Sequence, residues 1–426
     1  HAAWHLRYFE RQQYTMAIAA NCDIISSAAE PKPFWVTELQ GGTNIFSGFD
    51  PLCPSEDDIA QWLWTCIGSG AERVVFWTLN ARASVAEAGE WAMVTFQNEA
   101  TDRLTMSGNV AKVLLEENDF FEKAKTVKSD VNLIYSPESM IIFSEKTMAS
   151  GFDEDVPGRG KGAHIKSLLS YYETLLELGI SSSVKQMDHF DWELKTDKPR
   201  IAILANMLSI PSEFEDKLYT FVENGNKLIV TGLSGFYDEN MHNVYMSSDP
   251  YRELFGATLK EYKFVGDSFD IQLTDPQIEL PSHLVKGLIK TDKAKVIGTF
   301  NDDIIAVRNQ YGKGEVVWIP SLIGLGSWQK NNVSFAGFIK EETREVTQQL
   351  PFTLSGHSKH VLLKTMESDG NYLTVLINMK DENISVGLEK NVNKKARLIF
   401  GGKLIDDAND SSILLAPQET VVILWQ

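Results

Sequence analysis

The sequence predicts an α/β protein, because strand and helix patterns alternate over most of its 426 residues and strands alone fill the last part. Up to about residue 350, short β-branched and aromatic runs alternate with amphipathic stretches, which is typical of parallel sheets with right-handed crossovers. From about residue 355 the strand patterns are separated only by turn signals, which predicts antiparallel pairing. At about 150 residues per domain, we expect two to four domains.

The first segment, residues 1–125, is expected to be the C-terminal part of a (β/α)8 barrel. An N-terminal helix through Tyr14 and Ile18 leads to the strand "KPFWVTEL", and "ERVVFWTLN" is the next strand. Ser55 is expected to cap the helix between them, and a further helix falls at "GNVAKVLLEENDFFEKA". Two strands cannot close a barrel, so this segment corresponds to about its final quarter.

The second segment, residues 126–352, is expected to form a doubly wound α/β domain. Two of its expected helices end at Gly179 and Gly225, the residue type that usually follows a helix. The glycines of "QYGKG" predict a hairpin between the last two strands. The expected strands are "VNLIYS", "SSSVKQMD", "RIAILAN", "KLIVTG", "AKVIGTF", "IIAVRN" and "GEVVWIPS".

The third segment, residues 353–426, is expected to form a small antiparallel β-sandwich. Its strand patterns are short, and the turn signals "SDGN" and "FGGK" separate them. The expected strands are "HVLLKTMES", "NYLTVLINM", "ISVGLE", "ARLIFGG" and "SILLAPQETVVILWQ".

Composition excludes several classes of function. The net charge of −18 argues against binding to nucleic acid or to anionic membrane surfaces, which need clustered Lys and Arg. No run of about 18 apolar residues predicts a membrane span, and the compartment stays open between cytoplasm and periplasm. Cys22, Cys53 and Cys66 have no zinc spacing, and the eight histidines form no metal motif, so we expect no metal or other cofactor.

Glu38, in "PFWVTELQGG", is the first candidate for chemistry. A carboxylate at the C-terminal end of a parallel barrel strand lies where the active sites of that architecture are found. Retaining glycosidases need two carboxyl groups about 5–5.5 Å apart, and aromatic rings such as Trp35, Phe46 and Trp77 would stack on a sugar. The other interpretation is a glutamate that caps a turn beside a barrel core. One glutamate leaves both interpretations open.

The stretch "KPFWVTELQGGTNIFSG", followed by "VVFWTLNARASVAEAGEWAMVTFQNEATDRL", resembles glycoside hydrolase family 42, the β-galactosidases. The resemblance implies that Glu38 is the nucleophile at the end of the seventh barrel strand. It places Phe46 where the family has a tryptophan of the galactose pocket. It also implies that Trp77 ends the eighth strand and that Glu90, in "AGEW", is an acid that binds sugar hydroxyls.

The resemblance extends beyond the barrel. Family members continue into an α/β trimerisation domain and a small β domain, which implies a homotrimer that acts on a galactoside or a related neutral sugar. Three features depart from the family. Thr78, not arginine, follows Trp77, and Arg82 comes later; Met93 stands where the family has a histidine; the cysteines do not reproduce the zinc cluster of some members.

The second carboxyl of the pair is expected upstream of this sequence. In the family, the acid/base is the glutamate of an Asn-Glu pair that ends the fourth strand. The only acidic residues before Glu38 are Glu10, Asp23 and Glu30, and none of them follows an asparagine. We therefore expect a C-terminal part of a larger enzyme that is inactive alone on natural galactosides. The pair Asn98-Glu99 would provide the acid if this chain hydrolyses lactose by itself.

Two other functions compete with hydrolysis. The chain could be a non-catalytic oligomerisation or sugar-binding fragment with an incomplete barrel. The middle segment also resembles class I glutamine amidotransferases, whose chemistry needs a cysteine nucleophile activated by histidine. All three cysteines precede residue 67, so the middle segment has no such nucleophile. The sequence does not determine the sugar or the linkage.

Overall fold

The computed structural model describes residues 13–48, 51–150, 158–246, 248–330, 333–402 and 412–426. Within them the chain forms two compact units, and the fold is α/β. One unit comprises residues 1–128, 176–181 and 350–426, and the other comprises residues 129–175 and 182–349. No helix in the described part of the chain combines the length and the apolar character that crossing a membrane requires.

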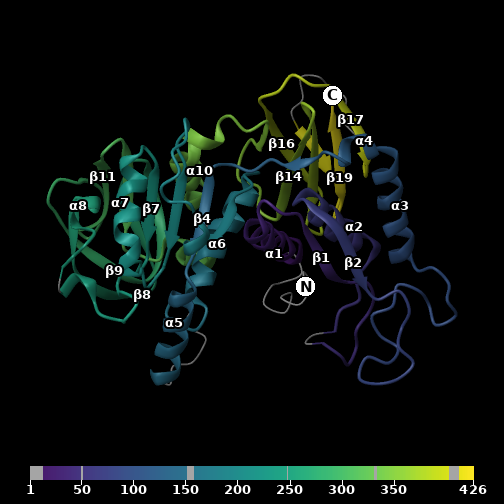
Figure 1. The fold of residues 1–426 in the computed structure, drawn as a ribbon, viewed down its shortest axis with the longest axis horizontal. Helices are drawn as coiled ribbons and strands as arrows, with labels where there is room; N and C mark the ends of the chain where they lie inside the picture. Colours follow the sequence, from purple (N-terminus) through teal and green to yellow (C-terminus); the bar gives the residue numbers. More distant parts are fainter. Residues whose placement is uncertain (1–12, 49–50, 151–157, 247, 331–332, 403–411) are drawn as a thin grey trace. The chain divides into compact units, whose positions relative to one another are not determined.

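The first unit begins with the expected alternation of helices and strands (Figure 1). The two strands pair in parallel, and the helix between them provides the crossover that parallel pairing needs. The predicted N-terminal helix is observed from Tyr14, and its earlier part lies outside the described residues. The elements are α1 (Tyr14–Ala29), β1 (Phe34–Gln40), α2 (Glu56–Gly68), β2 (Ala71–Trp77), α3 (Asp102–Glu116) and α4 (Asn118–Phe121).

Helix α2 begins where the sequence predicts. Ser55 is its N-cap, and its hydroxyl accepts a hydrogen bond from the backbone N–H of Asp58 at 3.2 Å. The Asp58 carboxylate accepts in turn from the Ser55 backbone N–H at 2.7 Å, which completes a capping box. This start matters for the site, because α2 connects the loop after β1 to the beginning of β2.

The C-terminal strands of the same unit form two sheets. The five-stranded sheet has the order β17-β19-β15-β14-β3, and the three-stranded sheet has the order β13-β16-β18. One core cluster takes side chains from both sheets, among them Leu363, Leu388 and Ile423. The strands are β3 (Lys125–Thr126), β13 (Phe352–Leu354), β14 (Val361–Ser368), β15 (Asn371–Asn378), β16 (Ile384–Lys390), β17 (Ala396–Phe400), β18 (Ser412–Leu415) and β19 (Thr420–Trp425).

A buried ion pair joins this five-stranded sheet to α1. Lys364 of β14 places its Nζ 2.6 Å from the Asp23 carboxylate, and both side chains are enclosed. Helix α2 lies against the same sheet, where the Trp64 and Phe400 rings approach to 5.4 Å between their centres. The C-terminal sheet and the helices around β1 and β2 therefore share one interior.

The second unit is built on a nine-stranded sheet with the order β5-β4-β6-β7-β12-β11-β10-β8-β9. Its first five strands pair in parallel, and the remaining pairs are antiparallel. The hairpin predicted at "QYGKG" is confirmed, because Tyr311 pairs with Gly314. The strands to β7 are β4 (Val131–Tyr135), β5 (Ser183–Gln186), β6 (Ile201–Ala205) and β7 (Lys227–Thr231); the last three are β10 (Lys295–Phe300), β11 (Asp303–Tyr311) and β12 (Gly314–Ile319).

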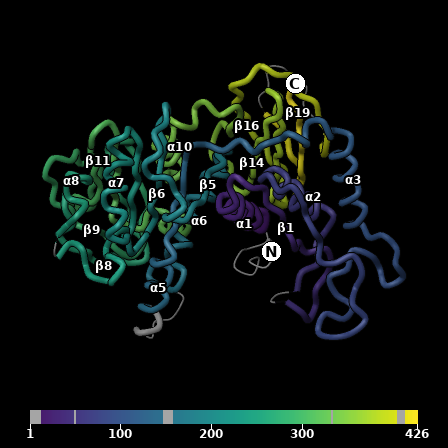
Figure 2. Tube along the Cα trace, in the orientation of Figure 1, coloured from purple at the N-terminus to yellow at the C-terminus, as the bar shows by residue number. Residues whose placement is uncertain are grey.

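Two long strands in this sheet were not predicted. β8 (Ala257–Thr274) and β9 (Gln277–Thr291) form one hairpin that Figure 2 follows as a continuous trace. Many residues of β8 are exposed on both faces of the strand. β8 also contains Gly266, and β9 contains Pro281. A strand with neither alternating burial nor an uninterrupted apolar run has little signal in the sequence.

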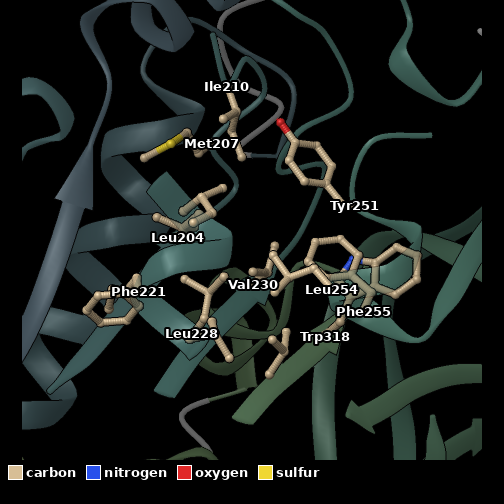
Figure 3. Close-up of a cluster of buried hydrophobic side chains, with 14 of the residues drawn as sticks. Leu204, Met207, Ile210, Phe221, Leu228, Val230, Tyr251, Leu254, Phe255 and Trp318 are labelled. Carbon is tan, nitrogen blue, oxygen red and sulfur yellow. The ribbon is translucent and has the colours of Figure 1, made fainter. Parts of the chain in front are cut away.

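Helices accompany the sheet of the second unit. Gly179 and Gly225 follow two of them with φ of 73° and 98°, the left-handed conformation expected for glycine after a helix. Apolar residues of neighbouring strands and helices gather in one buried cluster, part of which Figure 3 shows around Val230, Leu254 and Trp318. The helices are α5 (Pro137–Ser150), α6 (Ala163–Glu177), α7 (Glu215–Glu223), α8 (Arg252–Phe255), α9 (Ile323–Lys330) and α10 (Val333–Thr347).

Candidate active site

Glu38, Phe46, Trp77 and Glu90 lie around the carboxyl ends of β1 and β2, whereas Trp35 lies at the start of β1. The two strands end in register, with Gln40 paired to Trp77, and the Gly41 N–H donates to the Trp77 carbonyl at 2.9 Å. The segment after residue 90 joins these ends, because the Thr78 N–H donates to the Trp91 carbonyl at 2.8 Å. The Trp91 N–H donates to the Thr43 carbonyl, also at 2.8 Å. Three pieces of chain are thus fixed to one another by backbone hydrogen bonds.

Glu38 lies two residues before the end of β1 and is half-buried. Val36 pairs with Val74 and Leu39 pairs with Phe76, so β1 has one more residue than β2 between these pairs. This β-bulge contains Glu38. Bulges bend a strand and re-aim a side chain, and they are over-represented next to active sites. The carboxylate thus lies in an irregular part of the strand, close to the ends that gather the other candidates.

The Gly-Gly pair after Glu38 lies where the backbone approaches another segment too closely for a side chain. A Cβ placed on Gly42 would lie 2.1 Å from the Ala92 carbonyl oxygen, and one on Gly41 would lie 2.7 Å from the Met93 side chain. Glycine is the residue that permits such an approach. The pair therefore lets the end of β1 lie directly against residues 91–93.

Trp77 and Trp35 each carry an arginine over the ring. The guanidinium of Arg82 lies 4.8 Å from the Trp77 ring centre and also pairs with Glu87 at 3.4 Å. Arg73 lies 4.2 Å from the ring centre of Trp35, which is 47% exposed. The family has an arginine directly after the tryptophan that corresponds to Trp77, whereas here Arg82 comes five residues later. The loop after β2 brings Arg82 back to the Trp77 ring, where it makes a cation–π contact.

Phe46 and Glu90 are brought together directly. The Phe46 backbone N–H donates to Glu90 Oε1 at 2.8 Å, and the Ser47 N–H donates to Oε2 at 3.0 Å. The Ser47 hydroxyl also donates to this carboxylate, and it accepts from Trp91 Nε1 at 2.7 Å. Glu90 is buried, whereas the Phe46 side chain is 90% exposed. The carboxylate that the resemblance assigns to sugar hydroxyls is therefore bonded to the loop after β1.

The hydrogen bonds to Glu90 favour its ionised form. The Ser47 hydroxyl is the largest cause that holds the pKa of the Glu90 carboxyl below its ordinary value, and the backbone N–H groups of residues 45–47 act in the same direction. Glu90 is thus an anion bound by successive backbone N–H groups.

The residues that depart from the family pattern also have definite places. Met93, at the position of the family's histidine, is buried. Glu99 is exposed in a turn, where its N–H donates to the Thr95 hydroxyl at 3.1 Å and its carbonyl accepts from the Thr95 N–H at 2.9 Å. Cys22 and Cys66 are buried thiols with sulfurs 4.0 Å apart, and Cys53 is an exposed thiol.

Sequence reasoning did not find Ser47 or Trp91. A serine in a loop has no distinguishing signal, and its two side-chain partners lie more than 40 residues later in the chain. Trp91 directly follows Glu90 in "AGEW", and this position beside a candidate acid is the only sequence signal for its role. Its backbone has φ of 68°, which is an outlier for a bulky residue.

Comparison with known proteins gives two family matches. The profile described as "Beta-galactosidase" matches residues 3–115, and the profile described as "Beta-galactosidase trimerisation domain" matches residues 129–340. The β-galactosidase BgaA of Clostridium cellulovorans is 22% identical over 379 residues, which cover 85% of this chain and 52% of the relative. The β-galactosidase BgaB of a Geobacillus strain is 24% identical over 377 residues, which cover 86% and 52%.

A solved structure has the same fold. It is a catalytic mutant of Gan42B, a β-galactosidase of family 42 from G. stearothermophilus, and it matches with a TM-score of 0.75 at 18% identity. The match covers 100% of this chain and 58% of the solved one.

Fold and matches together define a protein of the glycoside hydrolase class. More narrowly, the chain belongs to glycoside hydrolase family 42, the β-galactosidase family, since the two profiles together cover most of its length. The chain spans about half the length of the curated relatives that it matches.

Proposed function

We propose that this chain carries the nucleophile of a retaining, β-galactosidase-like glycoside hydrolase, and that Glu38 is that nucleophile. The observation that supports this most is the place of Glu38 in a β-bulge near the carboxyl end of a parallel strand, in a chain of family 42. In this mechanism the carboxylate attacks the anomeric carbon, the glycosidic bond breaks and the aglycone leaves with a proton from the acid/base. Water then hydrolyses the resulting glycosyl-enzyme.

The other parts of the proposal follow the family pattern. Residues 1–125 are the C-terminal part of a (β/α)8 barrel, residues 126–352 are an amidotransferase-like α/β trimerisation domain, and residues 353–426 are a β-sandwich. Phe46 and Trp77 contact a galactoside or related neutral sugar, and the assembly is a homotrimer. In the family pattern the acid/base carboxyl precedes the nucleophile, upstream of the matched residues 3–115. Glu99 is the alternative acid/base within those residues.

An activated inhibitor tests Glu38 without help from a general acid. A 2-deoxy-2-fluoro-galactoside with a dinitrophenolate leaving group needs no protonation to react, so the nucleophile alone should trap the sugar. We expect peptide mass spectrometry of the 426-residue chain to find the sugar on Glu38. Glu38→Gln should abolish labelling, and Glu72→Gln, at an exposed glutamate of β2, should leave it unchanged. A label on another residue would refute the assignment.

The same reagents separate the alternative function. A non-catalytic oligomerisation or sugar-binding fragment would not be labelled at all, although it could still bind galactose.

Lactose hydrolysis decides the place of the acid. If the chain alone hydrolyses lactose and Glu99→Gln lowers the rate of hydrolysis by a factor of about 10²–10⁴, Glu99 is the acid/base. In an enzyme with all its catalytic groups, Glu38→Gln should lower kcat by several orders of magnitude.

A further inference from the structure

We propose that Glu90 is a positioning residue, whose buried carboxylate holds the loop of residues 43–48 so that Phe46 is presented to the sugar. The inference rests on the proposed function, and it gives Glu90 a different task from direct contact with sugar hydroxyls. Four features of the described residues carry it: the enclosed carboxylate, its donors, the constrained backbone beside it, and the exposure of Phe46.

The first step concerns the carboxylate. Glu90 is 4% exposed, and both of its oxygens accept hydrogen bonds from one short piece of loop. The donors are the N–H groups of Phe46 and Ser47 and the Ser47 hydroxyl. Successive backbone N–H groups that converge on one anion form a stable binding concavity. Charge-assisted hydrogen bonds are about twice as strong as neutral ones. A carboxylate with these donors is poorly placed to bind sugar hydroxyls as well.

The second step concerns the neighbouring residues that fix this arrangement. Trp91 donates its indole N–H to the Ser47 hydroxyl, and its backbone N–H donates to the Thr43 carbonyl. Trp91 has φ of 68°, a conformation that is unfavourable for a bulky residue and persists where the surroundings impose it. On the other side of the loop, the Asn44 amide donates to the Ser47 carbonyl at 2.6 Å. The loop is thus held at both ends and at its centre.

The third step concerns what the loop presents. Phe46 is 90% exposed although its own N–H is bonded to the buried carboxylate. An exposed ring on a fixed backbone can stack on the apolar face of a sugar with little loss of conformational freedom on binding. Phe46 thus offers an apolar contact where the family has a tryptophan, whereas Met93, where the family has a histidine, is buried and presents no polar group there.

Hydrogen exchange tests the positioning independently of any catalysis. We expect the Phe46 and Ser47 amides of the full chain to exchange at least tenfold faster in Glu90→Gln, because the charged acceptor is lost. Ser47→Ala should give a smaller acceleration, since the carboxylate remains. Glu72→Gln is the matched control and should change neither amide. Unchanged exchange in Glu90→Gln would overturn the proposal, whether or not the chain hydrolyses a galactoside.

A double-mutant cycle separates positioning from direct contact with the sugar. With a nitrophenyl galactoside as substrate, or with lactose binding by calorimetry if there is no turnover, Phe46→Ala and Glu90→Gln should each weaken the interaction. The double variant should be no weaker than Phe46→Ala alone, because Glu90 acts through Phe46. Additive losses would overturn the proposal and assign Glu90 to the sugar. If the chain shows neither turnover nor binding, the exchange experiment decides the positioning and labelling of Glu38 by the inhibitor decides the proposed function.

Discussion

His164, at the start of α6, is neutral in the folded protein. Its side chain is fully buried; Nδ1 donates to the Ala205 carbonyl at 3.0 Å, and Nε2 accepts from the Ser136 N–H at 3.1 Å. Burial is the main cause that lowers the pKa of His164 from 6.5 to about 4. The imidazole thus connects the ends of two parallel strands, β4 and β6, to helix α6.

Acidification should therefore destabilise the second unit. Between pH 6.5 and pH 4 the unfolded chain binds a proton at His164 that the folded chain does not, so stability falls as the pH falls through this range. From pH 7 to pH 5 the contribution of this residue should decrease by about 2 kcal/mol. Urea unfolding at both pH values checks this: His164→Gln should lose less stability than the native chain, and exposed His189→Gln should behave like the native chain. Equal losses in all three would contradict the assignment.

Single residues also mark the limit of prediction from sequence. The type and position of Glu38, Trp77 and Glu90 could be recognised from local motifs. The partners of Glu90 could not, because Phe46 and Ser47 lie more than 40 residues earlier and only the folded backbone brings them to the carboxylate. The contact of Arg82 with Trp77 could not be predicted either. The two residues are five positions apart in the sequence, and only the path of the loop after β2 brings the guanidinium over the Trp77 ring.

At the scale of elements, the capping box of α2 offers a local measure of stability. Ser55→Ala removes the hydroxyl that accepts from the Asp58 N–H, and loss of such a cap typically costs about 1 kcal/mol. We expect urea denaturation to show this decrease in the free energy of unfolding of the first unit. Ser84→Ala, an exposed position in the loop after β2, should be neutral. An unchanged free energy of unfolding in Ser55→Ala would mean that the capping box does not stabilise the first unit.

The Asp23–Lys364 pair should be far more sensitive. Lys364→Met removes the charge that faces Asp23 inside the unit, and loss of one member of a buried pair typically costs about 3–5 kcal/mol. Asp23→Asn combined with Lys364→Met should recover a large part of that loss, because no uncompensated charge is left. Thermal or urea unfolding of the single and double variants measures both effects. A double variant no more stable than Lys364→Met would refute this account.

Elements with a strong local signal were predicted, and those without one were missed. The strands β1 and β2 are aromatic and β-branched, and Ser55 marks the start of α2, so their order followed from the sequence. The turn "SDGN" is confirmed as well, since Asp369 and Gly370 have φ of 48° and 76° between β14 and β15. The hairpin of β8 and β9 was missed, because a partly exposed strand with charged residues lacks a regular period.

At the scale of the whole molecule, self-association is the main expectation. The profile that matches residues 129–340 is described as a trimerisation domain. The second unit exposes large apolar side chains, among them Ile141 at 61% and Phe264 at 72%. Single exposed apolar side chains are normal on a protein surface, so the expectation rests on the profile; closed symmetric assemblies are the usual result of self-association.

Light scattering over a dilution series tests the assembly. We expect a mass three times the 47.8 kDa of one chain at micromolar concentration. A strictly monomeric mass would contradict the trimer, and a stable dimer would correct its stoichiometry. Boundaries between domains at residues 125 and 352 stay predictions, and limited proteolysis of the assembled protein would measure where the chain is accessible to cleavage.

The close approach of Gly42 to Ala92 restricts how sugar selectivity could be redesigned. Any side chain at position 42 would meet the Ala92 backbone and push β1 away from residues 91–93, so a mutant library should return only glycine there. Position 46 is open, since the native ring already lies in solvent. Under the proposed function, a change of sugar selectivity should therefore start at Phe46 and leave "GG" intact, because that keeps the strand that carries Glu38 in place while its surroundings change.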